Sequence, residues 1–171
     1  MATTTKQVRI SIPGWLSVTL EPNVSETNAA WELYVELATR ISSKRFDRKH
    51  GSLRAALESL YAIFTQTRIV LRSAGPDVAK SKNSFGPFAI RFLTDVLGTF
   101  LLRWHEPLRA YEASKPEKIP VTDHERVWDR HEEFCQELDE LREKTTAYVK
   151  ALAQIAGVHH VHNKSVEKDQ A

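Results

Sequence analysis

The chain has 171 residues, of which 42% are hydrophobic and 27% are charged, and its formal net charge at pH 7 is +2. These values are typical of a soluble globular domain. With so small a net charge, the protein has no overall electrostatic field that would attract nucleic acid or anionic lipid. A lone cysteine, Cys135, excludes an internal disulfide, and the N-terminal residues lack the apolar core of a signal peptide. We therefore expect a cytoplasmic protein with no membrane association.

Residues 1–24 predict an N-terminal β-hairpin that packs on the rest of the chain. Residues 7–12 and 16–20 each alternate polar and apolar side chains, as half-buried strands do. Pro13 and Gly14 between them suit a type II turn, because proline presets φ and glycine accepts a positive φ. The side chains expected to face the helices are Val8, Ile10 and Ile12.

The bundle is expected over residues 25–157, and its first two helices follow the hairpin. The first should run from Ser25 or Thr27 to about Ser43, with apolar residues at helical spacing. The second should run from about Ser52 to Ala74, because Gly75-Pro76 cannot continue it. Its apolar seam repeats with spacings of four and three residues: Leu53, Leu57, Leu60, Phe64, Thr67, Leu71 and Ala74.

A third helix is expected from Ser84 to near His105, where Pro107 should kink or end it. It is apolar almost all round, and its length approaches that of a membrane span. Arg91 and Asp95 lie one helical turn apart in its middle, however, and each mid-membrane charge costs about 2.5–3.5 kcal/mol. We therefore expect a buried bundle helix with this pair at its exposed edge.

A fourth, long helix is expected to start at a capping box formed by Thr122 and Glu125 and to end at Gly157. Its seam also alternates four and three residues, which predicts a partner helix. The seam residues are Val127, His131, Phe134, Leu138, Leu141, Thr145, Tyr148, Leu152 and Ile155. The predicted fold is thus mainly all-α: an up-down four-helix bundle with a long C-terminal helix and an N-terminal hairpin. Residues 158–171 are expected to be a disordered polar tail.

No catalytic motif, metal-ligand set or cofactor motif emerges from the sequence. His131, Cys135 and Asp139 share one helical face, but a straight helix provides neither a pocket nor oxyanion donors. His124, His131 and Cys135 would need a further metal ligand from elsewhere. We interpret His131 as a polar seam residue that controls register, whose protonation near pH 6 would oppose packing.

The segment from Ser84-Phe85-Gly86-Pro87 to Arg103-Trp104-His105 resembles small helical proteins of bacterial signalling or defence loci. This resemblance covers only part of the chain and implies no chemistry for individual residues. It implies only that the chain belongs to such a system.

The main functional hypothesis is a non-enzymatic interaction module that homo-oligomerises, by default as a dimer, or docks a protein partner. The third and fourth predicted helices carry more apolar side chains than one bundle should bury. Exposed apolar patches generally mark interfaces, and a dimer is the commonest closed assembly. The interface candidates are Phe92, Phe100, Trp104, Phe134, Leu141 and Tyr148.

Two alternatives stay open. A nucleic-acid or anionic-ligand binding protein would use the basic connector, residues 44–50, through Lys44, Arg45, Arg48 and Lys49. An enzyme would need residues that converge only in three dimensions, such as His50, His105 and His131.

Overall fold

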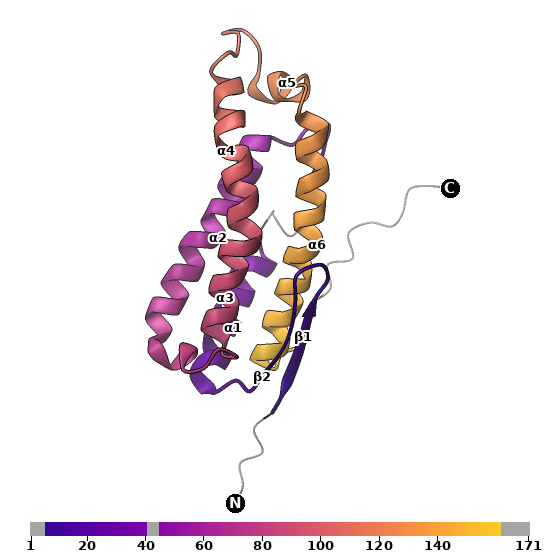
Figure 1. The fold of residues 1–171 in the computed structure, drawn as a ribbon. Helices are drawn as coiled ribbons and strands as arrows, with labels where there is room; N and C mark the ends of the chain where they lie inside the picture. Colours follow the sequence, from indigo (N-terminus) through magenta and orange to yellow (C-terminus); the bar gives the residue numbers. More distant parts are fainter. Residues whose placement is uncertain (1–5, 41–44, 162–171) are drawn as a thin grey trace, which may run out of the picture.

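The computed structural model describes residues 6–40 and 45–161, and it is mainly helical with a two-stranded hairpin at its N-terminus (Figure 1). The elements in chain order are β1 (Val8–Ile12), β2 (Leu16–Leu20), α1 (Val24–Ala38), α2 (Leu53–Ala74), the 3-10 turn η2 (Pro76–Ala79), α3 (Phe85–Arg91), the π-helical segment η3 (Phe92–Gly98), α4 (Thr99–Glu112), α5 (Val121–Arg126) and α6 (His131–Ala156).

The expected hairpin is confirmed. The strands pair antiparallel, with Val8 opposite Leu20 and Ile12 opposite Leu16. Gly14 has φ +69°, and the Trp15 N–H donates to the Ile12 carbonyl over 3.1 Å to close the turn. The alternate side chains of β1 are buried, and β1 packs on α6, so α6 covers the apolar face of this small sheet.

The first two helices begin at side-chain caps. The Asn23 side chain accepts from the Glu26 N–H, and the Glu26 carboxylate accepts from the Asn23 N–H, which forms a capping box. This box starts α1 at Val24, before the expected Ser25 or Thr27, and α1 ends at Ala38, well before Ser43. Helix α2 has the expected bounds: the Ser52 side chain caps it, and Gly75 with φ +74° follows its end.

Segments α3, η3 and α4 form one continuous helical rod, Phe85–Glu112, of 28 residues. Among the described residues this rod alone is long and apolar enough to cross a membrane by length and composition. Pro107 lies inside α4 and does not end it. The pairing of Arg91 with Asp95 at an exposed edge is confirmed, with an N–O distance of 3.3 Å.

The long C-terminal helix is shorter than expected because its predicted first turn is separate. Residues 127–130 are non-helical and interrupt the predicted helix between α5 and α6. The expected seam residue Val127 is 76% exposed. The expected capping box at Thr122 is also wrong: Pro120 precedes α5, without a side-chain cap. The Glu125 carboxylate instead binds the start of α2, far away in the sequence.

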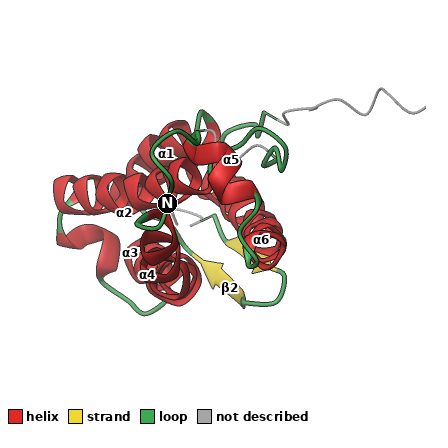
Figure 2. Ribbon diagram, turned by 90° about the horizontal axis from the view of Figure 1, so that it is seen from above, coloured by secondary structure: helices red, strands yellow, loops and turns green. Residues whose placement is uncertain are grey.

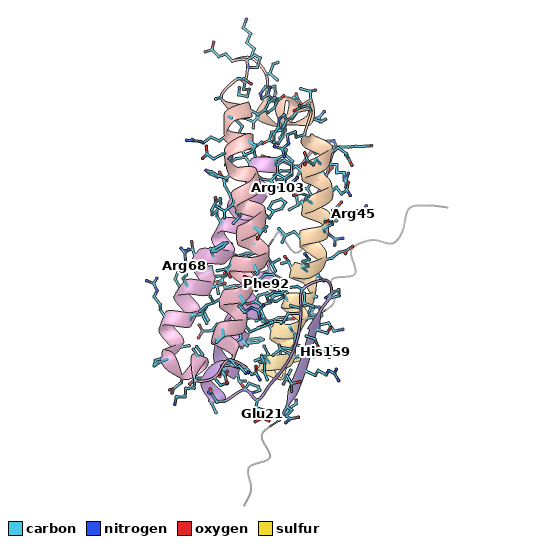
Figure 3. All side chains as sticks on the ribbon, viewed as in Figure 1. Glu21, Arg45, Arg68, Phe92, Arg103 and His159 are labelled. Carbon is cyan, nitrogen blue, oxygen red and sulfur yellow. The ribbon has the colours of Figure 1, made fainter. Side chains whose placement is uncertain are left out.

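The helices lie side by side along the long axis of the molecule and surround a common interior (Figures 1 and 2). Helix α1 packs mainly on α6 and α2, and α4 also contacts α2 and α6. Phe92 points into the interior (Figure 3). Its ring stacks on that of Tyr148 at a centroid distance of 3.8 Å. The two longest helical segments, the rod and α6, thus share an aromatic core.

The tail expected to be disordered begins at residue 158. Of it, residues 158–161 are described, and the Val161 N–H donates to the Tyr34 hydroxyl on α1 over 3.0 Å. The remaining tail residues, 162–171, lie outside the described part of the chain.

Candidate binding pocket

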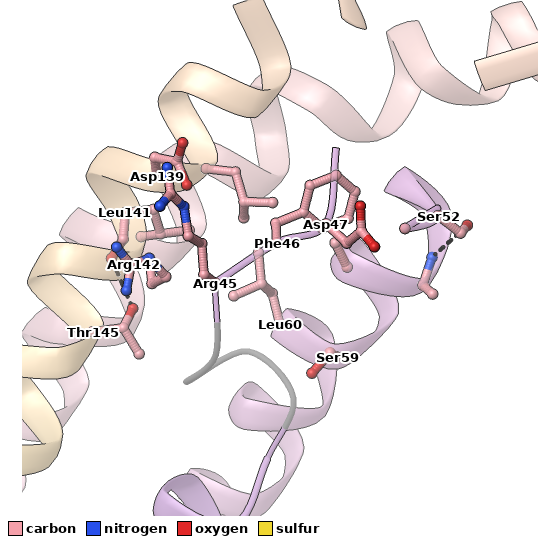
Figure 4. A pocket seen from close by; sticks show the side chains of 14 residues that line it. Arg45, Phe46, Asp47, Ser52, Ser59, Leu60, Asp139, Leu141, Arg142 and Thr145 are labelled. Carbon is pink, nitrogen blue, oxygen red and sulfur yellow. Dashed lines mark hydrogen bonds between the residues drawn. The ribbon is translucent and has the colours of Figure 1, made fainter. Parts of the chain in front are cut away.

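A partly open pocket of about 290 Å³ lies between the basic connector, the first half of α2 and the middle of α6 (Figure 4). Its position follows from the unequal lengths of the helices. Helix α1 has 15 residues, whereas α2 has 22 and α6 has 26. At 1.5 Å per residue, α1 is therefore shorter than its neighbours by roughly 10–17 Å. Beyond the end of α1, residues 45–52 are non-helical, and several of them line the space between α2 and α6.

The wall of the pocket is mainly apolar. Phe46 from the connector lies between the two helices, with Leu60 of α2 on one side and Leu141 of α6 on the other (Figure 4). Polar side chains lie among these apolar groups and at the rim. The lining residues are Arg45, Phe46, Asp47, Gly51, Ser52, Ala55, Ala56, Ser59, Leu60, Leu138, Asp139, Leu141, Arg142 and Thr145.

Asp47 orders the connector at the rim. Its Oδ1 accepts from the backbone N–H groups of Lys49, over 2.8 Å, and His50, over 3.1 Å. Its Oδ2 lies 3.0 Å from His50 Nδ1. These hydrogen bonds, first the one from the Lys49 backbone and then that from the His50 side chain, lower the pKa of Asp47. Its negative charge is therefore already stabilised within the connector.

Arg48 holds the connector to α6. Its guanidinium donates to Glu132 and, over 2.6 Å, to Asp139. These two hydrogen bonds, with Asp139 first, raise the pKa of Arg48 above its ordinary value. The charge of Arg48 is thus matched by two carboxylates, and the charge of Asp139 is matched by Arg48.

Arg45 and Arg142 differ from Arg48, because neither forms an ion pair or a hydrogen bond within the described part of the chain. Arg45 is exposed and extends from the connector toward α6, where Arg142 lines the same pocket (Figure 4). The Nε atom of Arg142 is buried and finds no acceptor among the described residues. Because no described carboxylate pairs with either guanidinium, an anionic ligand in the pocket would supply the missing partner.

The N-terminus of α2 borders the pocket but is not a free anion site. The Glu125 carboxylate accepts from the N–H groups of Leu53, over 2.8 Å, and Arg54, over 3.0 Å. The Ser52 hydroxyl accepts from the Ala55 N–H over 3.2 Å. These groups take up the donors that a helix end would otherwise offer. Any anion in the pocket must therefore bind to side chains.

The structure separates the predicted anion-binding residues. Arg45 lines the pocket, Arg48 is paired with carboxylates, and Lys49 is exposed on the connector. Lys44 lies outside the described residues. Sequence reasoning missed Arg142, since its place beside Leu141 on the flank of a seam looks like that of any solvated helix residue.

The six predicted interface residues all lie in the core of the chain itself, from 0% exposed for Phe92 to 6% exposed for Leu141. Trp104 shows why: its Nε1 donates to Glu137 over 2.7 Å, and the Arg130 guanidinium lies over its ring at 4.4 Å. One chain therefore buries these side chains without a partner. Their role in an interface stays a prediction, and Leu141 also lines the pocket described above.

The candidates for catalysis and metal binding do not converge on a site. Cys135 Sγ lies 3.8 Å from both ring nitrogens of His131, but burial raises the pKa of the Cys135 thiol to about 11, which opposes thiolate formation. The ring of His124 stacks on Tyr111 at 4.1 Å, away from this pair. Within the described ranges, no group of three or more His, Cys, Asp or Glu residues could hold a metal ion.

Comparisons with family models, with curated proteins and with solved structures found no match to this chain. The function proposed below therefore rests on the pocket and the residues that line it.

Proposed function

We propose that the protein is a non-enzymatic binding module whose pocket takes a small ligand with one acidic group and an apolar body. The observation that carries this proposal is the pair of arginines, Arg45 and Arg142, that line a mainly apolar pocket and have no acidic partner among the described residues. Pockets of this kind, apolar with a few placed polar groups, are the usual form of small-molecule sites.

The proposed scaffold is an incomplete up-and-down four-helix bundle made of α1, α2, the Phe85–Glu112 rod and α6. In this interpretation α1 fills its corner of the bundle over only half the length. The packing of α1 on both α2 and α6 supports it. The pocket then occupies the unfilled half of that corner, so its walls come from rigid helices on either side.

Charge favours a small ligand over nucleic acid. Arg48 is already paired with Glu132 and Asp139, which leaves Arg45 and Lys49 as the exposed cations of the described connector. So few free cations neutralise few phosphates, whereas nucleic-acid binding proteins usually make many such contacts. A single acidic group needs only one or two arginines.

Isothermal titration calorimetry with naphthalene-2-sulfonate tests the proposal, because this probe joins one anionic group to an apolar ring system. Saturable binding with one site per chain is expected. The variant Ala55→Phe places a ring at the pocket wall and should abolish it. Ala110→Phe, at an exposed position of α4 outside the pocket, is the matched control. Equal binding by Ala55→Phe and the wild-type chain would refute the pocket as the site.

A second candidate is the docking of a protein partner, or of a second copy, through apolar side chains that remain exposed. Trp31 on α1 is 48% exposed, and Leu102 on α4 is 84% exposed. Light scattering of the purified protein at low and high salt tests this candidate. A salt-resistant dimer that becomes a monomer in Leu102→Gln or Trp31→Gln supports it, and a monomer at all concentrations contradicts self-association.

A further inference from the structure

We infer that the ligand of this pocket is a monocarboxylate with a linear or small-ring apolar body, whose carboxylate pairs with Arg142. This inference rests on the proposed function and specifies its ligand. It follows from three properties of the pocket: its volume, the unpaired Arg142 in its wall, and the two carboxylates at its rim.

The volume limits the size of the ligand. The pocket volume of about 290 Å³ lies at the lower end of the range of about 300–1,000 Å³ that is usual for small-molecule sites. A monocarboxylate of about six to ten carbons matches this space. The ribose and phosphates of a nucleotide would meet apolar walls formed by Phe46, Leu60, Leu138 and Leu141.

The guanidinium of Arg142 is the expected partner of the ligand's acidic group. Arg142 lines the pocket without a hydrogen bond or ion pair to any described residue, and a guanidinium offers donors in a planar fork that matches a carboxylate. Thr145, one helical turn along α6, cannot replace it as the donor, because its hydroxyl already donates to the Leu141 carbonyl over 2.9 Å. Arg142 is therefore the group in the wall best placed to bind an anion.

Two acids at the rim disfavour a second negative charge on the ligand. Asp47 and Asp139 both line the pocket, and their charges are stabilised by the connector backbone and by Arg48. A second carboxylate on the ligand would lie near these acids, and Arg45, the other unpaired arginine of the lining, is exposed and would offset this repulsion only weakly. Repulsion between the second carboxylate and these acids should make a dicarboxylate bind more weakly than a monocarboxylate of the same length.

The test compares octanoate, octan-1-ol, octylamine and octanedioate by isothermal titration calorimetry with the whole chain. Octanoate should bind at least about tenfold more tightly than the other three, as expected for a hydrogen-bonded ion pair. In Arg142→Gln this preference over octan-1-ol should fall below about threefold, and Arg142→Lys should retain part of it. Arg109→Gln is the control, since Arg109 lies on α4 and pairs with Glu106.

Each other outcome overturns a stated part. If naphthalene-2-sulfonate binds in the pocket but octan-1-ol binds as well as octanoate, the carboxylate inference is wrong and the proposed function stands. If octanoate binds and Arg45→Gln, rather than Arg142→Gln, removes the preference, the assignment to Arg142 is wrong. If no probe binds the folded wild-type chain, both the inference and the proposed function are wrong.

Discussion

The carboxylate of Glu125 accepts a hydrogen bond from the backbone N–H of Leu53 over 2.8 Å, so a residue of α5 caps the first turn of α2. Glu26 performs the same task elsewhere, since its Oε1 accepts from the Phe85 N–H over 2.6 Å at the start of α3. Both glutamates are buried, at 1% and 3% exposed. Helix starts that are distant in the sequence are therefore joined through buried carboxylates.

Replacing Glu125 by alanine should destabilise the fold by about 2–4 kcal/mol, because it leaves buried N–H groups at the start of α2 without acceptors. Urea denaturation followed by circular dichroism measures this change. Glu117→Ala, at an exposed position in the turn before α5, is the control and should shift the free energy of unfolding by less than about 0.5 kcal/mol. Equal effects of the two variants would refute the capping role.

Tyr148 should make the fold sensitive to alkali. Its hydroxyl is buried without a partner among the described residues, and burial raises its pKa well above the ordinary value of 10.0. The unfolded chain therefore releases this proton first, so the free energy of unfolding should fall as the pH rises above 10. In Tyr148→Phe this fall should be shallower, and at pH 7 the variant should be as stable as the wild type or more stable by about 1 kcal/mol. A wild-type alkaline profile in the variant would contradict this prediction.

His131 should contribute to acid sensitivity. Burial is the main cause that lowers its pKa below 6.5, opposed by the nearby carboxylates of Glu132 and Glu125. Because the unfolded chain binds this proton first, the stabilisation is complete above pH 6.5 and declines as the pH falls below it. Thermal unfolding of His131→Gln between pH 7.5 and 5 should show a smaller loss of Tm than the wild type. His159→Gln, exposed after α6, should follow the wild type.

Gly51 should control the shape of the pocket. A Cβ at this position would lie 2.5 Å from the Asp47 carbonyl oxygen and 2.6 Å from the ring of Phe46. Gly51→Ala must therefore displace the connector, at a cost of about 1–3 kcal/mol. We expect a lower Tm together with weaker binding of naphthalene-2-sulfonate. Ser73→Ala, exposed near the other end of α2, should change neither.

Local patterns in the sequence predicted the helices whose ends depend on nearby residues. Ser52 and Gly75 bound α2 as expected, and the alternation in β1 placed Val8, Ile10 and Ile12 in the core. These features depend on interactions within a few residues, which a sequence displays directly. The same local reasoning failed at Thr122, because the expected partner of its cap, Glu125, binds α2 instead.

The sequence by itself determined the mainly helical class, the hairpin and the apolar faces, because propensity and periodicity act over short distances. Only the tertiary structure decided that Phe92 and Tyr148 bury each other, since burial depends on which helices become neighbours. It also decided the pocket, which arises where α1 ends before α2 and α6 do. The difference between Arg48 and Arg142 has the same origin: one meets carboxylates of another helix, and the other meets none among the described residues.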